Sequence, residues 1–260
     1  MVHRMKNKIF PFILTTLTLS FPLFAADMSR SDIEQSLKNA DATHIADLRR
    51  KDFRGLNLSN LDFRYADLWG TDLRDTVLNG SRLEKLNLDL TVMTRVHLAG
   101  ADLSESSVFG VSMMDADLSH AQLSGSRFIA NLDRANLSHA QIKNAKWGVD
   151  MKNQPMGLMN VSLNGANLSY ANLADADLSR ARLKQANLSN SILKQANLYG
   201  ADLTAADFSG ADLSGADLRA CRFSDSIFNG ANLQGAKLSL TTDKKIFQHS
   251  VNLSSALFLD

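Results

Sequence analysis

Residues 166–190 read ANLSYANLADADLSRARLKQANLSN, and leucine returns at every fifth position of this stretch. A period of five fits neither an amphipathic helix, with its period of 3.6, nor a strand, with its period of 2. It indicates a chain that turns after every few residues. Four sides of five residues make a square coil of twenty, in which each leucine is the inward-pointing centre of a side.

The same pattern continues in both directions from this stretch. Centres recur in phase over residues 53–128, over 132–147 after a deletion of one residue, and over 158–238. All thirty-seven centres are Leu, Phe, Ile, Val, Met or Trp, and the position two before each centre is mostly small. Twelve of the fourteen glycines lie two residues after a centre, where a type II turn at a corner needs a positive φ. We therefore expect the centre and the small residue to point inward and the other three residues to point outward.

Alanine, then Asp or Asn, then the centre is the commonest order, as in SGADLSGADL at residues 209–218. This pattern resembles the A(D/N)LXX motif of the pentapeptide-repeat family. The resemblance implies an all-β fold, a right-handed quadrilateral parallel β-helix, over residues 51–238. At roughly 4.8 Å per coil, about nine coils would form a rod of roughly 45 Å. The early repeats fit less well, since large residues take small positions at Lys51, Leu56, Leu61 and Leu86. We expect a bulge or an open first coil there.

The repeats are flanked and interrupted by other segments. Residues 27–50 form a cap segment, in which Ser31 to Glu34 match a capping box and predict a short helix over the open end of the coil. Residues 239–260 form a C-terminal cap and partial coil, with 241–249 as a loop or short helix that plugs the end through Ile246 and Phe247. A break near 148–157 contains the extra piece 150–155. It is either a recognition loop or a tolerated bulge, and the short length favours a bulge.

Residues 1–26 have the layout of a secretory signal peptide. Arg4, Lys6 and Lys8 precede an uncharged apolar stretch that ends in Ala25 and Ala26. An uncleaved membrane anchor is the alternative, but the stretch is short and contains two prolines. We expect a periplasmic or secreted protein that meets the membrane only through this peptide.

Composition excludes several classes of function. With 28 Lys+Arg against 27 Asp+Glu, the chain lacks the basic excess of a nucleic-acid-binding protein. Its single cysteine excludes an intramolecular disulfide. We find no phosphate-binding loop, nucleophile elbow or zinc-protease motif. The many Asp and Asn residues occupy one repeat position, where hydrogen bonds at turns explain them. We expect no enzyme activity and no cofactor.

Three histidines are weak candidates for a metal site. His120 and His139 follow their centres at the same offset and are nineteen residues apart across the deletion. Stacking would place them about 5 Å apart in adjacent coils, with His97 one coil earlier on that side. Solvated histidines in a copied LSHA segment are the simpler interpretation.

An apolar column is the best candidate for protein binding. Trp69, Phe109 and Ile129 follow their centres at the same offset on one side, and Leu90 lies beside this column. Large apolar residues that face outward in one stack are typical of a partner site. Scattered surface aromatics, or cover by the helix predicted within 29–48, are the alternatives.

These observations favour an exported, non-enzymatic binding or structural scaffold with an unknown protein partner. The alternative is a duplex-mimicking modulator of a type II topoisomerase, an activity that the family resemblance suggests. It would require a cytoplasmic chain and a long acidic stripe. The sequence offers only the acidic ring Asp202, Asp207, Asp212 and Asp217, interrupted by cations such as Arg180, Lys184 and Lys194. An enzyme would need a catalytic constellation that the sequence lacks.

Overall fold

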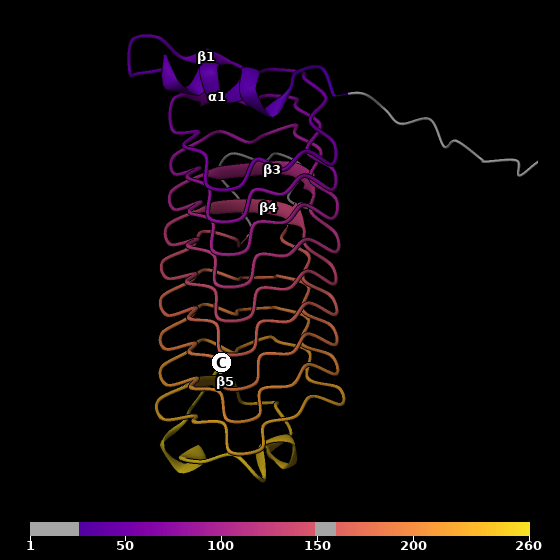
Figure 1. The fold of residues 1–260 in the computed structure, drawn as a ribbon. Coiled ribbons are helices and arrows are strands. Elements are labelled where there is room, and N and C mark those ends of the chain that lie inside the picture. The colour runs from indigo at the N-terminus through magenta and orange to yellow at the C-terminus, as the bar shows by residue number, and fades with distance from the viewer. Residues whose placement is uncertain (1–25, 149–159) are drawn as a thin grey trace, which may run out of the picture.

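The computed structural model describes residues 26–148 and 160–260 as a stack of coils (Figure 1). Regular elements are short, because the chain turns at every corner. They are helix α1 (Arg30–Lys38), strands β1 (Ala46–Asp47), β2 (Ala66–Asp67), β3 (Ser107–Ser112), β4 (Arg127–Asn131), β5 (Lys237–Ser239) and β6 (Leu257–Leu259), and 3₁₀ helices η1 (Lys244–Phe247) and η2 (Leu253–Ser255).

Parallel backbone bridges join residues twenty apart on four sides of each coil. One side pairs β1 with β2, in the register Ala46 to Ala66. The other three sides carry isolated bridges, which begin with Asp52 to Asp72, Asn57 to Val77, and Asp62 to Arg82. Across the deletion the spacing falls to nineteen, as in Asp117 to Asn136. The predicted stacking by twenty, and by nineteen across the deletion, is confirmed, and the chain forms a four-sided parallel β-helix.

The interior is a continuous apolar core built from the centres. Leu58, Leu118 and Leu178 are fully buried, and so are most residues at the second inward position, such as Ala181. Aromatic centres stack from coil to coil, with ring centroids 5.2 Å apart for Phe128 and Trp147. The predicted division into inward and outward positions is correct for these residues and fails at Ile129, which is buried.

The corners use the left-handed backbone conformation. All twelve glycines that lie two residues after a centre have φ between +64° and +70°. A side chain other than glycine pays a conformational cost there, which Asn and Asp tolerate best. The glycine signal in the sequence therefore marked the corners correctly.

Helix α1 lies across one end of the stack (Figure 1). Its only fully buried side chain is Ile33, and Arg30 donates to the carbonyl oxygens of Asn57 and Ser59. The capping box is formed by Ser29 and Asp32, so the prediction of Ser31 and Glu34 was wrong. Glu34 instead accepts a hydrogen bond of 2.6 Å from Arg30, one turn earlier on the helix.

The coil begins one repeat before the predicted start at residue 51. Leu48 is fully buried as a centre, and β1 pairs in register with β2. The register also stays at twenty beside the large residues Leu56, Leu61 and Leu86. The expected bulge or open first coil is therefore wrong for this described region. Leu86 is buried and the other two are partly buried against the core, so the interior accommodates their side chains.

The register across the break is thirty-one residues, as in Asn131 to Ser162 and Lys146 to Asp177. Eleven residues beyond one coil are therefore accommodated between Gly148 and Asn160. Leu163 is therefore the centre of the side that follows Trp147 in the stack. The sequence pattern had assigned the next centre after Trp147 to Leu158. The predicted extra piece 150–155 and the predicted centre Leu158 lie outside the described residues.

The other end of the stack is closed by aromatic side chains. Phe247 of η1 is fully buried and contacts Phe223 and Phe228 edge to face, while Ile246 is partly buried. β6 then pairs with β5 in the register Leu238 to Phe258. A partial coil thus follows η1 and completes the core.

Candidate protein-binding side of the coil

One side of the coil carries strands β1 to β6 and three surface grooves, which are described below. We call it the tryptophan side. Its inward centres are Leu48, Leu68, Leu88, Val108, Phe128, Trp147, Leu178, Leu198, Leu218 and Leu238. Because each strand ends at a corner after a few residues, the side chains between the centres face outward at regular intervals.

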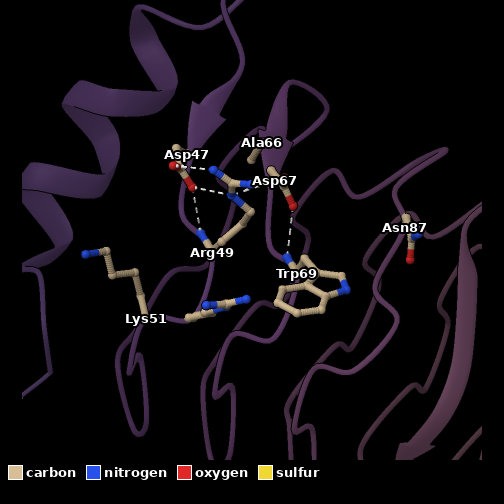
Figure 2. Close-up of a pocket in the computed structure, with 8 residues that line it drawn as sticks. Asp47, Arg49, Lys51, Ala66, Asp67, Trp69 and Asn87 are labelled. Carbon is tan, nitrogen blue, oxygen red and sulfur yellow. Dashed lines mark hydrogen bonds and ion pairs between the residues drawn. The ribbon is translucent and has the colours of Figure 1, made fainter.

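The N-terminal part of this side is organised by arginines (Figure 2). Arg49 donates two hydrogen bonds of 2.8 Å to the Asp47 carboxylate and lies 3.5 Å from Asp67. The hydrogen bonds from Arg49 hold the pKa of Asp47 well below its usual range. Asp67 in turn accepts from the backbone N–H of Trp69 at 3.0 Å. These contacts hold the backbone of Trp69, the first residue of the apolar column, in place.

Trp69 forms one wall of an open groove. The guanidinium carbon of Arg50 lies 4.8 Å from the centre of the indole ring, within the range of a cation–π contact. The groove has a volume of about 850 Å³ and is also lined by Lys51 and Asn87. Within the described part of the chain, neither Arg50 nor Lys51 forms an ion pair.

Leu90 is the most exposed member of the predicted column. Its side chain is 56% exposed, and its backbone adopts φ +62°, a conformation that is costly for leucine. The corner positions of the coils before and after it are occupied by Gly70 and Gly110. Asp89 beside it accepts from the backbone N–H of Phe109 at 2.9 Å. Leu90 therefore has an unfavourable backbone conformation, and its side chain is largely exposed.

Phe109 and Ile129 are direct neighbours in β3 and β4, as expected. Trp69 and Phe109 are half-buried, but Ile129 is only 2% exposed. The prediction that Ile129 faces outward was wrong. Because one residue is missing after Phe128, the chain passes this corner without a positive φ, and the inward Ala130 follows Ile129 directly. Ile129 instead lines a small groove with Asn160 and Arg182.

A second aromatic groove on this side was missed by sequence reasoning. Tyr199 lines an open groove of about 500 Å³ with Arg180 and Lys237. The guanidinium carbon of Arg219 lies 5.7 Å from the centre of the tyrosine ring, and Arg219 pairs with Asp217 at 2.6 Å. Tyr199 shares the column of Trp69 because the bridge register across the break is thirty-one residues instead of twenty. A count of repeats alone assigns it to another side.

The histidine positions follow the expected stacking. The rings of His120 and His139 are parallel, with centroids 4.8 Å apart, and Tyr170 continues the stack at 5.0 Å. His97 lies on the same side but in another column, beside Asp117. Imidazole lone pairs lie in the ring plane, so two parallel rings do not direct them at one ion. Within the described residues, no group of three or more His, Cys, Asp or Glu side chains is placed to hold a metal.

The single cysteine occupies a small inward position. The thiol of Cys221 donates to the carbonyl oxygen of Leu198, with 3.0 Å between sulfur and oxygen. Burial raises the pKa of Cys221 to about 12, so the thiolate is a minor species at neutral pH. Over residues 26–148 and 160–260, no helix is both long and apolar enough to span a membrane.

The family to which the repeats are similar agrees with this architecture. The family model for pentapeptide repeats matches residues 46–146 and 158–242. HetL from Nostoc sp. strain PCC 7120, a pentapeptide repeat protein involved in the regulation of heterocyst differentiation, is 28% identical, with 88% of this chain and 94% of that chain covered and a TM-score of 0.45. QnrB1, a plasmid-mediated fluoroquinolone resistance protein, is 19% identical, with 74% and 92% covered and a TM-score of 0.44. Curated protein sequences yield no match.

The family match covers well over half of the chain, and its residues are those that form the coils. Centres that are buried every five residues, corners with positive φ and parallel bridges every twenty residues are the structural basis of that match. The chain belongs to the pentapeptide-repeat family.

Proposed function

We propose that this chain is an exported, non-enzymatic scaffold that binds another protein in the cell envelope or outside the cell. The observation that carries the proposal is the placement of Trp69, Leu90 and Phe109 on the tryptophan side. Leu90 is largely exposed and adopts a costly backbone conformation, so the fold gains little from leucine there. Large exposed apolar side chains are typical of partner sites.

A rigid rod is a suitable support for such a surface. Its about nine coils share one apolar core, so neighbouring outward side chains keep a fixed spacing of ~4.8 Å. Helix α1 would cap one end of the rod through Ile33, and Phe247 would cap the other. Solenoids need such caps because a terminal coil otherwise exposes its core.

Export is supported by the sequence of residues 1–26, and the contacts of Asp27 are compatible with it. The backbone N–H of Asp27 donates to the carbonyl oxygen of Asp52 at 3.0 Å, and the Asp27 carboxylate accepts from the N–H of Asp52. Cleavage after Ala25 or Ala26 would leave Asp27 available for both contacts.

A non-enzymatic role agrees with the state of the described carboxyl groups. Hydrogen bonds from arginine side chains lower the pKa values of Asp47, Asp52 and Asp75. A general acid at neutral pH requires the opposite shift. These carboxylates are suited to holding arginines in place rather than to proton transfer.

The topoisomerase alternative is less well supported by the surface charges. Asp202 lies 3.4 Å from Lys184 and from Arg222, while Asp212 lies 3.2 Å from Lys194. Three of the four carboxylates in the predicted acidic ring are paired with cations, since Asp217 pairs with Arg219. A mimic of duplex DNA needs an unpaired series of negative charges.

Three substitutions made together test the proposed binding side. The mature protein carrying Trp69→Ser, Leu90→Ser and Phe109→Ser should melt within ~5 °C of the parent, which is within ~2 kcal/mol for a chain of this size. It should also lose the partner that crosslinks to the parent in the envelope fraction. Tyr170→Ser is the matched control, because Tyr170 is exposed on another side, and this variant should keep the partner.

Two outcomes would contradict the proposal. A triple variant that retains the partner would exclude the tryptophan side as the binding surface. An N-terminus at Met1 on cytosolic protein, instead of Ala26 or Asp27 on exported protein, would exclude export and favour the topoisomerase alternative.

A further inference from the structure

We propose that the partner contributes an extended peptide segment that is acidic at both ends and apolar in the middle. Its ends would occupy the Trp69 and Tyr199 grooves, and the part next to the Trp69 groove would lie over Leu90 and Phe109. The inference rests on the proposed function, since it specifies the partner of the same side.

The Trp69 groove can receive a carboxylate. The charge of Arg49 is already compensated by Asp47 and Asp67, so Arg49 lines the groove without being available to a ligand carboxylate. Arg50 and Lys51 remain as cations outside the ion pairs described for this groove, and the guanidinium carbon of Arg50 lies 4.8 Å from the centre of the indole ring. A guanidinium group that is oriented in advance loses less side-chain entropy when it binds an anion.

The Tyr199 groove repeats this arrangement with different residues. Arg219 is neutralised by Asp217 and lies over the tyrosine ring. Arg180 and Lys237 line the groove and form no ion pair within the described part of the chain. Each groove therefore combines one aromatic ring, one arginine paired with aspartate and two further cations that form no ion pair within the described residues.

The distance between the grooves defines the length of the ligand. Trp69 and Tyr199 occupy the same column six coils apart, which corresponds to ~29 Å along the rod. An extended peptide advances ~3.3 Å per residue, so about nine residues span both grooves. Arginine and aromatic anchors with apolar contacts between them are typical of protein interfaces.

Charge on the rod favours a peptide on this side and argues against a nucleic acid. The opposite side, whose centres include Leu58, Leu118 and Leu188, has no Lys or Arg at its described outward positions. On the tryptophan side Arg127 and Lys146 lie in the third and fourth coils beyond Trp69, while the two coils directly after Trp69 hold Leu90, Phe109 and the carboxylate of Asp89. A polyanion with a phosphate at every residue would meet apolar groups and a negative charge there.

The test uses the mature chain and a synthetic nine-residue peptide with two glutamates at each end and five apolar residues between them. Trp69 reports binding by its fluorescence, because the other tryptophan, Trp147, is fully buried. We expect saturable binding, a loss of more than about tenfold in affinity for a six-residue version that reaches one groove, and no binding of a lysine-ended version at ~1 mM.

Arg50→Gln and Arg180→Gln test the two grooves separately. Glutamine occupies the same corner position at residues 185 and 195, so both variants should fold, which a melting curve verifies. Calorimetric titration should show a loss of about fivefold or more in affinity for each variant and a larger loss for the double variant. Lys143→Gln, which changes a cation on a neighbouring side, should bind like the parent.

Each remaining outcome decides between the two proposals. If the peptide does not bind, or binds equally to both arginine variants, the acidic-segment proposal is wrong, while loss of the natural partner in the triple serine variant would still support the binding side. If a ten-nucleotide single strand binds more tightly than the peptide and depends on the same arginines, the ligand is a nucleic acid. If the triple serine variant keeps its natural partner, the proposed function fails even when the synthetic peptide binds.

Discussion

The coils before the insertion, residues 46–146, and those after it, residues 160–238, share one core but differ in almost everything around it. Their centres are equally buried, as Leu78 and Leu178 illustrate. They differ in the second inward position and in the charges outside. A buried centre is therefore what every coil needs in order to form, whereas the second inward residue and the outward charges differ from coil to coil.

The second inward position is chemically mixed in the earlier coils. Thr71 and Thr76 are buried there, and their hydroxyl groups donate to the carbonyl oxygens of Leu48 and Phe53 in the preceding coil. In the later coils this position is mostly alanine, such as Ala181 and Ala196. A buried hydroxyl is tolerated only because a backbone acceptor lies within reach.

The outer surface of the earlier coils is built from ion pairs between coils. Arg95 donates to Asp75 at 2.7 Å, and Arg134 donates to Asp115 at 2.8 Å. The later coils more often use neutral amides, as where Asn197 donates to Asp177 at 3.0 Å. Exposed ion pairs contribute little each, so these pairs orient side chains more than they stabilise the rod.

The largest effect is expected at a centre. Leu178→Asp should destabilise the protein by several kcal/mol, because it buries a charge without a partner. Leu78→Asp should be equally damaging if the two regions share one core. Ser179→Asp, at the next outward position, should cost little in a thermal melt. Equal losses for Leu178→Asp and Ser179→Asp would refute the inward assignment.

A smaller effect should reveal the difference at the second inward position. Ala196→Leu should cost ~1–3 kcal/mol by overpacking, although the earlier coils accommodate Leu86 at the equivalent position. Ala174→Leu is the control, since Ala174 lies at an outward position of the same region. A harmless Ala196→Leu change in urea unfolding would mean that the later coils are as adaptable as the earlier ones.

Acid should weaken the earlier coils. Hydrogen bonds from Arg95 and Arg134 lower the pKa values of Asp75 and Asp115 in the folded state. Such carboxylates stabilise the fold above the unfolded value of about 4, and this contribution is lost as the pH falls through the folded pKa. Melting temperatures measured from pH 6 to pH 2.5 should therefore fall below pH ~4. The fall should be smaller for Asp75→Asn, and an identical profile would remove this ion pair as a cause.

The smallest effect is expected at Leu90 and has the opposite sign. Leu90→Asn should raise the melting temperature by ~1–3 °C, because asparagine tolerates a positive φ better than leucine. The same change should weaken partner binding. Asn190→Leu, at a corner of the later coils, is the reverse control and should lower the melting temperature. A destabilised Leu90→Asn protein would show that the leucine contributes to the fold.

Much of the fold could be predicted from a single chain because its signals are local. The centres, the small residues and the glycines each depend only on neighbours within one side, so a period of five predicts the inward face and the corners. The N-terminal boundary was less predictable. Whether Ser29 or Ser31 caps α1 depends on the contact that Glu34 makes with Arg30.

The candidate site was only partly predictable, for a physical reason. Stacking by twenty placed Trp69, Leu90 and Phe109 together, but the exposure of Ile129 depends on how the chain passes a corner with one residue missing. The sequence by itself determined the coil, its corners and the column before the deletion. Only the tertiary structure decided that the register across the break is thirty-one residues, which places Tyr199 in the column of Trp69. The physical reason is that a count along the sequence must include every insertion, while backbone pairing depends on contacts in space.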